Sequence, residues 1–104
     1  MLKREKRRYL ALKTVSEQPL DELAVLDAVQ ASVHRLFGEY GASKANIKLI
    51  KGIPEKCQVV IRCSHTMLER VTAAIASTVE VDGKTVAIHV VGVSGTLKAL
   101  SKKT

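Results

Sequence analysis

Aromatic side chains are scarce in this sequence, which has one phenylalanine, two tyrosines and no tryptophan. Phe37 and Tyr40 fall on an apolar helical stripe, where we expect them in the core, and Tyr9 lies at the tip of a predicted strand. Modules that stack nucleobases on a sheet carry aromatic rings on their first and third strands. The third predicted strand has no aromatic residue, so base stacking on an open sheet is not expected.

Cysteine is also rare, and its spacing excludes two kinds of site. Cys57 and Cys63 share the apolar run KCQVVIRC, and on a strand they would lie roughly 20 Å apart. That distance is too long for a disulfide, and two thiols are too few for a zinc site. We predict that both are buried free thiols.

Carboxylates do not cluster in a pattern that would hold a catalytic metal ion. The aspartates are Asp21, Asp27 and Asp82, and no D-x-D pair exists. A protein-only nuclease usually needs such clustered carboxylates. We therefore expect no catalytic residue, metal or cofactor in the protein itself.

Long apolar runs are absent as well. No segment approaches the roughly 20 apolar residues that span a bilayer, and MLKREKRRYL has no apolar region behind its charges, unlike a signal peptide. The length of 104 residues fits one domain. We expect a cytoplasmic protein with a basic arm over 1–8 and a basic helix or tail over 95–104.

Positive charge is abundant, and it is concentrated at the two ends. The formal net charge is +7; residues 1–8 contribute +4 (five basic, one acidic), residues 94–104 contribute +3, and residues 9–93 carry nine charges of each sign. Basic ends on a neutral body indicate a polyanion binder, the alternative being two solubilising tails. The predicted binding cations are Lys3, Arg4, Lys6, Arg7, Arg8, Lys98, Lys102 and Lys103.

Hydrophobic periodicity predicts the element order β-α-β-β-α-β followed by a short helix. The predicted strands are 9–16, 46–52, 56–63 and 84–93, with an Asp82-Gly83 turn before the last. A helix of about five turns follows Pro19 and ends at Gly41 as a left-handed cap. Its expected core stripe is Leu23, Leu26, Val29, Val33, Leu36, Phe37 and Tyr40.

The second helix begins at Ser64, or at a Thr66–Glu69 capping box. Its inner stripe is Leu68, Val71, Ile75 and Val79, and a last helix over about 95–103 places Leu97 and Leu100 on one side.

The predicted order is that of the α+β ferredoxin-like (RRM-like) sandwich, in which helices cover one face of a four-stranded antiparallel sheet. The first and last strands are antiparallel neighbours in that topology, so both basic ends would meet at one edge. The uncovered face would show a half-apolar surface suited to a protein partner. Its residues would be Ala11, Lys13, Gln58, Val60, Arg62, His89 and Val91.

The segment GVSGT, residues 92–96, resembles two catalytic motifs only loosely. A nucleophile elbow is G-x-S-x-G, and here the second glycine falls one residue early. A P-loop is absent too. We expect Gly95 to turn the chain and Ser94 or Thr96 to cap the last helix, and free N–H groups there could also hold a phosphate.

A weaker basic cluster surrounds the middle hairpin. It consists of Lys44, Lys48, Lys51 and Lys56. These lysines form either a possible second phosphate contact or an ordinary edge strand protected from aggregation.

Three segments carry a resemblance to a known family. KRRYLALKTVSE (6–17), IRC (61–63) and GVSGTLKALSKK (92–103) resemble the archaeal ribonuclease P protein component 2 family, the small subunit of archaeal and eukaryotic ribonuclease P. The similarity covers essentially the whole chain, and GVSGT-[IL]-K is its most specific part.

The resemblance implies a subunit of an RNA-based endoribonuclease that removes the 5′ leader from precursor tRNA. Catalysis would belong to the RNA component with its bound magnesium. The protein would bind that RNA, contact precursor tRNA only indirectly, and pair with a TIM-barrel subunit as a heterodimer or heterotetramer.

The sequence alone leaves two alternative functions to consider. An acylphosphatase-like enzyme shares the sandwich but needs an arginine-bearing loop after the first strand, where this chain has the acidic SEQPLDEL. A protein–protein interaction module without RNA contact is the stronger alternative.

Overall fold

The computed structural model describes residues 6–103, with side chains to residue 101, and confirms the predicted element order. A sheet of four strands is joined by two main helices, two short 3-10 turns and a two-stranded hairpin. The elements are β1 (Arg7–Val15), α1 (Glu22–Ala45), β2 (Lys48–Ile53), η1 (Pro54–Lys56), β3 (Gln58–Ser64), η2 (His65–Met67), α2 (Leu68–Ser77), β4 (Glu80–Val81), β5 (Lys84–Thr85), β6 (Ala87–Ser94) and α3 (Leu97–Lys103).

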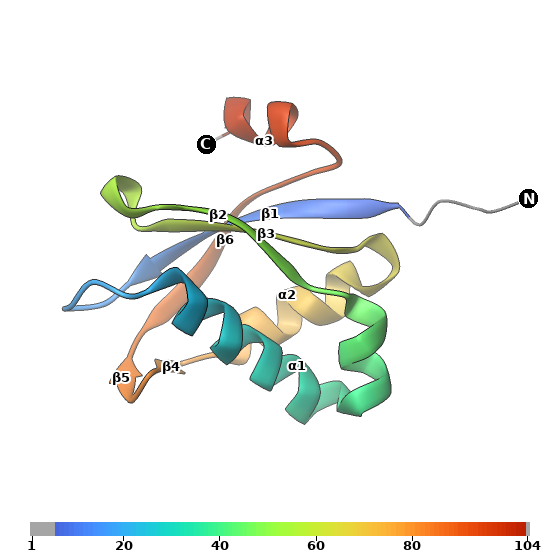
Figure 1. The fold of residues 1–104 in the computed structure, drawn as a ribbon, viewed down its shortest axis with the longest axis horizontal. Helices are drawn as coiled ribbons and strands as arrows, with labels where there is room; N and C mark the ends of the chain where they lie inside the picture. The colour runs from blue at the N-terminus through green and yellow to red at the C-terminus, as the bar shows by residue number, and fades with distance from the viewer. Residues whose placement is uncertain (1–5, 104) are drawn as a thin grey trace, which may run out of the picture.

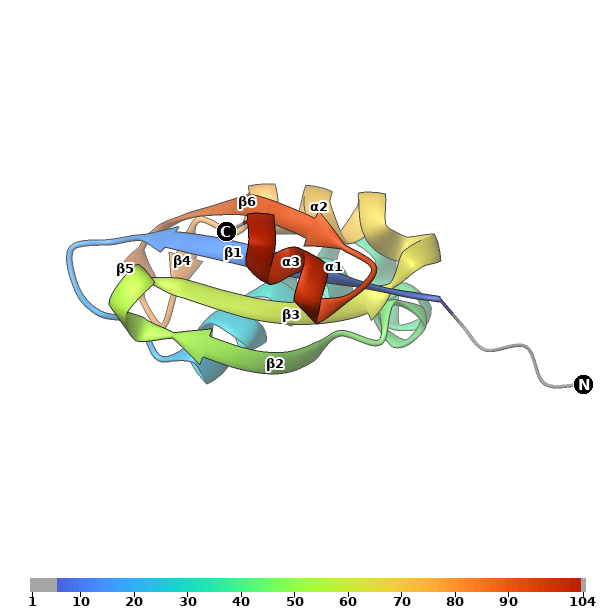
Figure 2. The ribbon, with the colours of Figure 1, turned by 90° about the horizontal axis from the view of Figure 1, so that it is seen from above.

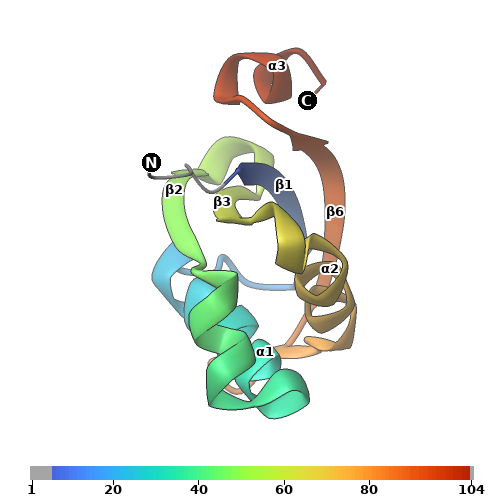
Figure 3. The same cartoon turned by 90° about the vertical axis from the view of Figure 1, so that its right-hand side faces the viewer.

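The four-stranded sheet has the order β2-β3-β1-β6, with every neighbouring pair antiparallel. Helices α1 and α2 pack on one face, as predicted, and α3 lies on the opposite face (Figures 1 and 3). Each outer strand has one extra residue that forms a bulge, Ile50 in β2 and Val91 in β6. The ferredoxin-like fold is therefore confirmed.

The main core lies between the sheet and the two long helices. Alternate residues of β1 and β3 supply the sheet side, and residues three or four apart supply the helix side. Its buried members include Leu10, Leu12, Ile61, Val25, Val29, Val33, Val71 and Ile75.

Helix α1 departs from the prediction at its C-terminal half. Gly41 is helical and buried, so it is no cap; the left-handed cap is Asn46, and Gly38 interrupts the helix at φ 75° and ψ −178°. A stripe counted at helical spacing is not preserved across such a residue. Tyr40, predicted in the core, is 79% exposed, whereas Phe37 packs against the core.

The first half of α1 also differs, because its buried face is centred on Val25, Val29 and Val33. Leu23 points away from that face, and Leu36 follows it near the break at Gly38; both are exposed, contrary to the prediction.

Smaller corrections concern the second half of the chain. No side-chain cap is present at the N-terminus of α2, so the predicted Ser64 and Thr66–Glu69 caps are wrong. Val79 follows the helix end and is exposed. Cys57 was predicted buried but is exposed, because it ends the 3-10 turn in a left-handed conformation; Cys63 is buried as predicted.

The turn at Asp82-Gly83 is confirmed. Both residues have positive φ, 52° and 77°, as a type I′ hairpin turn requires. This short hairpin, β4–β5, accounts for the later start of the last strand, which begins at Ala87 instead of residue 84.

Helix α3 covers part of the sheet face that was expected to be open. Leu100 is buried against Ala11 and Val60, with Tyr9 and Ile50 packed around them. Ala11 and Val60 are therefore not surface residues, which corrects the predicted open face. The reason is that the last helix folds back over the sheet.

Candidate RNA-binding surface

The beginning of β1 and the end of β6 are adjacent, as the fold prediction required. Tyr9 is paired with Ser94 in the antiparallel register. Arg8 lies close to the turn, since a Cβ built on Gly95 would be 3.6 Å from its Nη1 atom. Figure 2 shows the two strand ends at the same side of the sheet. Cations of the N-terminal segment and the start of the C-terminal segment therefore share one region.

The turn into α3 is built by two hydroxyl groups. Ser94 Oγ accepts a hydrogen bond from the N–H of Thr96 at 3.3 Å, and Thr96 Oγ1 accepts one from the N–H of Ala99 at 3.2 Å. Thr96 is thus the predicted helix cap, and Ser94 stabilises the turn before it. Both hydroxyls act on the backbone and direct α3 across the sheet.

Not every predicted cation falls within the described part of the chain. Lys6 and Arg7 are exposed and Arg8 is half-buried, with its Nη1 donating to the carbonyl of Arg7 at 3.0 Å. Lys98 is exposed in the first turn of α3. Lys3 and Arg4 lie outside the described residues, as do the side chains of Lys102 and Lys103.

The C-terminal helix does not stay at the rim. From the turn at Gly95, α3 runs back over the middle of the sheet, as Figures 1 and 2 show from two directions. The backbone of residues 97–103 consequently lies over the sheet face.

Two lysines of the middle hairpin, Lys48 and Lys51, lie on the same face, opposite Arg62 and Val60 of β3. Lys44, Lys48, Lys51 and Lys56 are all exposed. Lys48 lies directly opposite Arg62 of β3, and Arg62 lies opposite Tyr9 of β1. Arg62 was not among the predicted RNA-binding residues. Its place between two basic segments is visible only once the strand register is known.

Cys63 is buried beneath this region, on the opposite side of β3. Burial raises the pKa of its thiol to about 11, while the positive charge of Arg8, its partner on β1, lowers it. The thiol is therefore protonated and unreactive at neutral pH.

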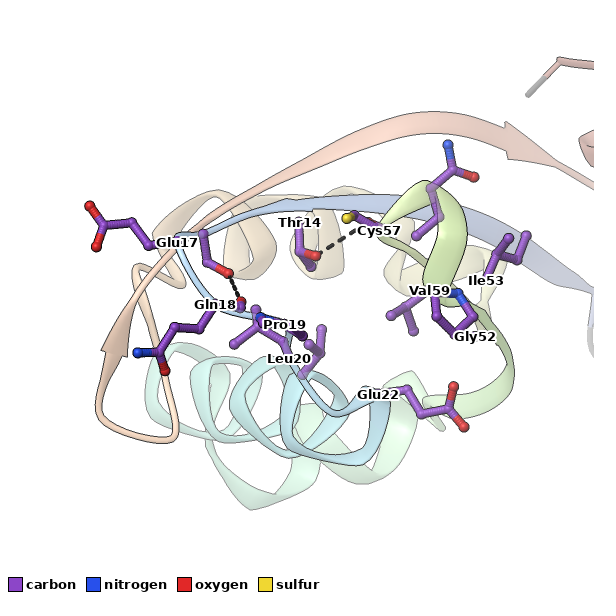
Figure 4. A pocket seen from close by; sticks show the side chains of 14 residues that line it. Thr14, Glu17, Gln18, Pro19, Leu20, Glu22, Gly52, Ile53, Cys57 and Val59 are labelled. Atoms are coloured by element: carbon purple, nitrogen blue, oxygen red, sulfur yellow. Dashed lines mark hydrogen bonds between the residues drawn. The ribbon is translucent and has the colours of Figure 1, made fainter.

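A hollow of about 330 Å³ opens at the other end of β1, between the β1–α1 loop and the β2–β3 connection (Figure 4). Thr14 Oγ1 donates to the carbonyl of Cys57 at 3.2 Å across one side of it. Its charged lining residues are Glu17 and Glu22, and no lysine or arginine lines it. This negative hollow does not suit a phosphate.

Within residues 6–101, no group of three or more His, Cys, Asp or Glu side chains is placed to hold a metal ion. None of the helices in the described part of the chain is both long enough and apolar enough to cross a membrane.

The chain matches the Rpp14/Pop5 family over residues 8–104. It belongs to this family. The match includes both strand ends, the middle hairpin and α3, so the resemblance seen in KRRY, IRC and GVSGTLK is confirmed.

Two relatives of this Rpp14/Pop5 chain are archaeal proteins. The ribonuclease P protein component 2 of Methanosarcina mazei is 35% identical over 96% of this chain and 84% of its own length. That of Pyrococcus furiosus is 33% identical over 96% of this chain and 83% of its own.

A chain of the cryo-EM structure of yeast ribonuclease MRP has the same fold. The TM-score is 0.68 at 14% identity, and the superposition covers 93% of this chain and 79% of that one. The two chains therefore share the fold although few of their residues are identical.

Proposed function

We propose that this Rpp14/Pop5 family chain is a protein subunit of ribonuclease P, the RNA-based endoribonuclease that removes the 5′ leader from precursor tRNA. It binds and stabilises the catalytic RNA, which holds the magnesium and performs the cleavage. The chain contributes no catalytic residue of its own and works in the cytoplasm.

One observation carries this proposal: exposed cations collect where β1 begins and β6 ends, and acids do not neutralise them. Among the described residues, Lys6, Arg7, Arg62, Lys48 and Lys98 take part in no ion pair. Unpaired cations on one surface attract phosphates. Phosphate contacts position an RNA without reading its sequence, which suits a protein that supports a folded RNA.

The effect on catalysis follows from electrostatics. A folded RNA brings phosphates close together, and their repulsion opposes the active shape. Lysine and arginine side chains at these positions reduce that repulsion and release counterions. The magnesium concentration needed for cleavage should therefore fall when this protein binds.

We also propose that a TIM-barrel subunit of the same enzyme binds this chain, as a heterodimer or heterotetramer. The helix layer offers apolar side chains for such a partner: Tyr40 is 79% and Leu36 is 46% exposed on α1. Tyrosine is enriched at protein interfaces relative to the rest of the surface. RNA and protein would then use opposite faces of the sandwich.

Reconstitution tests the proposal. The protein, with and without the TIM-barrel subunit, is added to ribonuclease P RNA, and precursor tRNA cleavage is measured at limiting magnesium. The double variant Arg7→Gln/Arg8→Gln should raise the magnesium requirement. Its control, Arg35→Gln/Arg70→Gln, removes the same charge from exposed positions on the helix layer.

Equal cleavage by both double variants would show that the strand-end cations do not act on RNA. If the pairing with the TIM-barrel subunit were retained in that case, the chain would be an interaction module without direct RNA contact.

A further inference from the structure

Four residues, one from each strand, form a row across the sheet. Lys48 of β2 lies opposite Arg62 of β3, Arg62 opposite Tyr9 of β1, and Tyr9 opposite Ser94 of β6. Residues directly opposite each other on antiparallel strands point to the same face, with Cβ atoms about 5 Å apart. The row therefore joins the hairpin lysines to the basic strand ends.

The row lies on the face that α3 partly covers. Ile61 and Cys63, on either side of Arg62, are buried in the main core under the helices. Because successive side chains of a strand alternate between faces, Arg62 points the other way. The next alternate residue, Val60, meets Leu100 of α3, so the row lies directly beside the residues that α3 covers.

The pairing of Lys48 with Arg62 is unfavourable in the protein by itself. Like charges directly opposite each other on neighbouring strands destabilise a sheet. Neither side chain forms an ion pair within the described residues. A pair that breaks a local stability rule in this way is typical of a functional site, and an anion between the two cations would relieve the repulsion.

Tyr9 adds a ring to this cationic row. It is half-buried, with one part packed against the Ala11–Val60–Leu100 cluster. Arg62 is its direct cross-strand neighbour, and Arg7 is two residues away on the same face. A partly packed ring among cations suits a nucleobase flanked by phosphates, because bases stack on aromatic rings while the backbone follows the positive charge.

We propose that Tyr9, Arg62 and Lys48 bind an unpaired nucleotide of the RNA, with its base stacked on the Tyr9 ring and the adjoining phosphates on the two cations. This inference depends on the proposed function, since it specifies how the same surface meets RNA. It requires a single-stranded segment, because a duplex hides the faces of its bases. A single aromatic ring is enough to stack one base, so the scarcity of aromatic residues in this sequence does not conflict with the proposal.

Tyrosine fluorescence provides a direct test. The sequence has no tryptophan and only two tyrosines, so Tyr40→Phe leaves Tyr9 as the single tyrosine emitter. Tyr40 is an exposed residue of α1, on the other layer. The full-length Tyr40→Phe protein is titrated at low salt with an oligouridylate and with an RNA duplex of equal length.

Stacking predicts that the oligouridylate quenches Tyr9 emission and that the duplex binds without quenching it. In a parallel titration, Tyr9→Phe should retain oligouridylate affinity. Tyr9→Leu, which keeps an apolar contact for α3 but has no aromatic face, should lose about tenfold. The thermal midpoints of both variants confirm that the fold is intact.

The possible failures are distinguishable. The inference would be wrong if oligouridylate bound in a salt-dependent way without changing Tyr9 emission, and if Tyr9→Leu bound it with wild-type affinity. The proposed function would remain intact in that case. Absence of binding to either RNA would overturn both. If polyglutamate, an acidic polymer without bases, bound as tightly as oligouridylate, the inference would be wrong and the row would be a site for an acidic protein.

Discussion

Leu100 of α3 lies on Ala11 of β1, and the two side chains are 2% and 1% exposed although they are outside the main core. This contact attaches the basic C-terminal segment to the sheet. Leu100→Ala should destabilise the attachment by about 2 kcal/mol. We expect hydrogen exchange at the α3 amides to become faster, while exchange in the core strands changes little.

The matched control for that variant is Leu97→Ala. Leu97 is in the same helix but is exposed, so its truncation should leave exchange in α3 nearly unchanged. Equal acceleration by both variants would mean that Leu100 does not anchor the helix.

RNA affinity should depend steeply on salt, because each phosphate contact releases counterions. If about five contacts form, the slope of log affinity against log salt should be roughly −3.5. Filter binding between low and physiological salt measures it. Arg7→Gln should make the slope less steep by about one contact, and a slope near zero for the wild type would eliminate the electrostatic mechanism.

Arg62→Gln should separate binding from stability. It removes the like-charge repulsion with Lys48, so we expect unchanged or slightly higher thermal stability together with weaker RNA binding. Arg35→Gln, an equal charge change on α1, should leave RNA affinity nearly constant. Calorimetry and RNA titration of both variants check this, and a loss of stability in Arg62→Gln would indicate a structural role.

Gly38 should be sensitive to substitution for a conformational reason. Its φ of 75° with ψ of −178° belongs to a region that only glycine adopts readily, and a Cβ there would touch nothing within 4 Å. Gly38→Ala should therefore cost about 1–3 kcal/mol through backbone strain alone. Gly95→Ala, at a position without positive φ, should cost much less in the same urea titration.

Cys63 should make stability fall at high pH. Its pKa of about 11 in the fold exceeds the ordinary 9.0, so folding favours the protonated thiol. That contribution is complete below pH 9 and disappears as pH rises towards 11. The difference in unfolding free energy between wild type and Cys63→Ala, followed from pH 8 to 11, should shrink in this window. A constant difference would contradict it.

Strand positions and the sandwich topology could be predicted because alternation in segments such as YLALKTVS reflects one buried face. The meeting of the start of β1 with the end of β6 followed from topology alone, whereas the pairing of Tyr9 with Ser94 needed the register. The break at Gly38 could not be predicted, since glycine is tolerated within helices, and Gly41 has the same local sequence signal. Once the break was missed, Tyr40 was assigned to the wrong environment.

The position of α3 depends on tertiary contacts that no local pattern contains. Leu97 and Leu100 indicated an apolar side, but the receiving surface, Ala11 and Val60, was taken for an open face. Arg62 was likewise visible as a surface residue. Its relation to Lys48 needed the bulge at Ile50, which shifts the register of β2.

The bulges at Ile50 and Val91 bear on how the enzyme assembles. Each bulge lies in an edge strand of the sheet. A bulge twists an edge strand, so that a strand of another chain cannot easily pair with it. Neighbouring subunits should consequently attach through side chains and helices, and strand addition should not occur. The two bulges should also protect the protein, when it is not bound to RNA, from self-association through its edge strands.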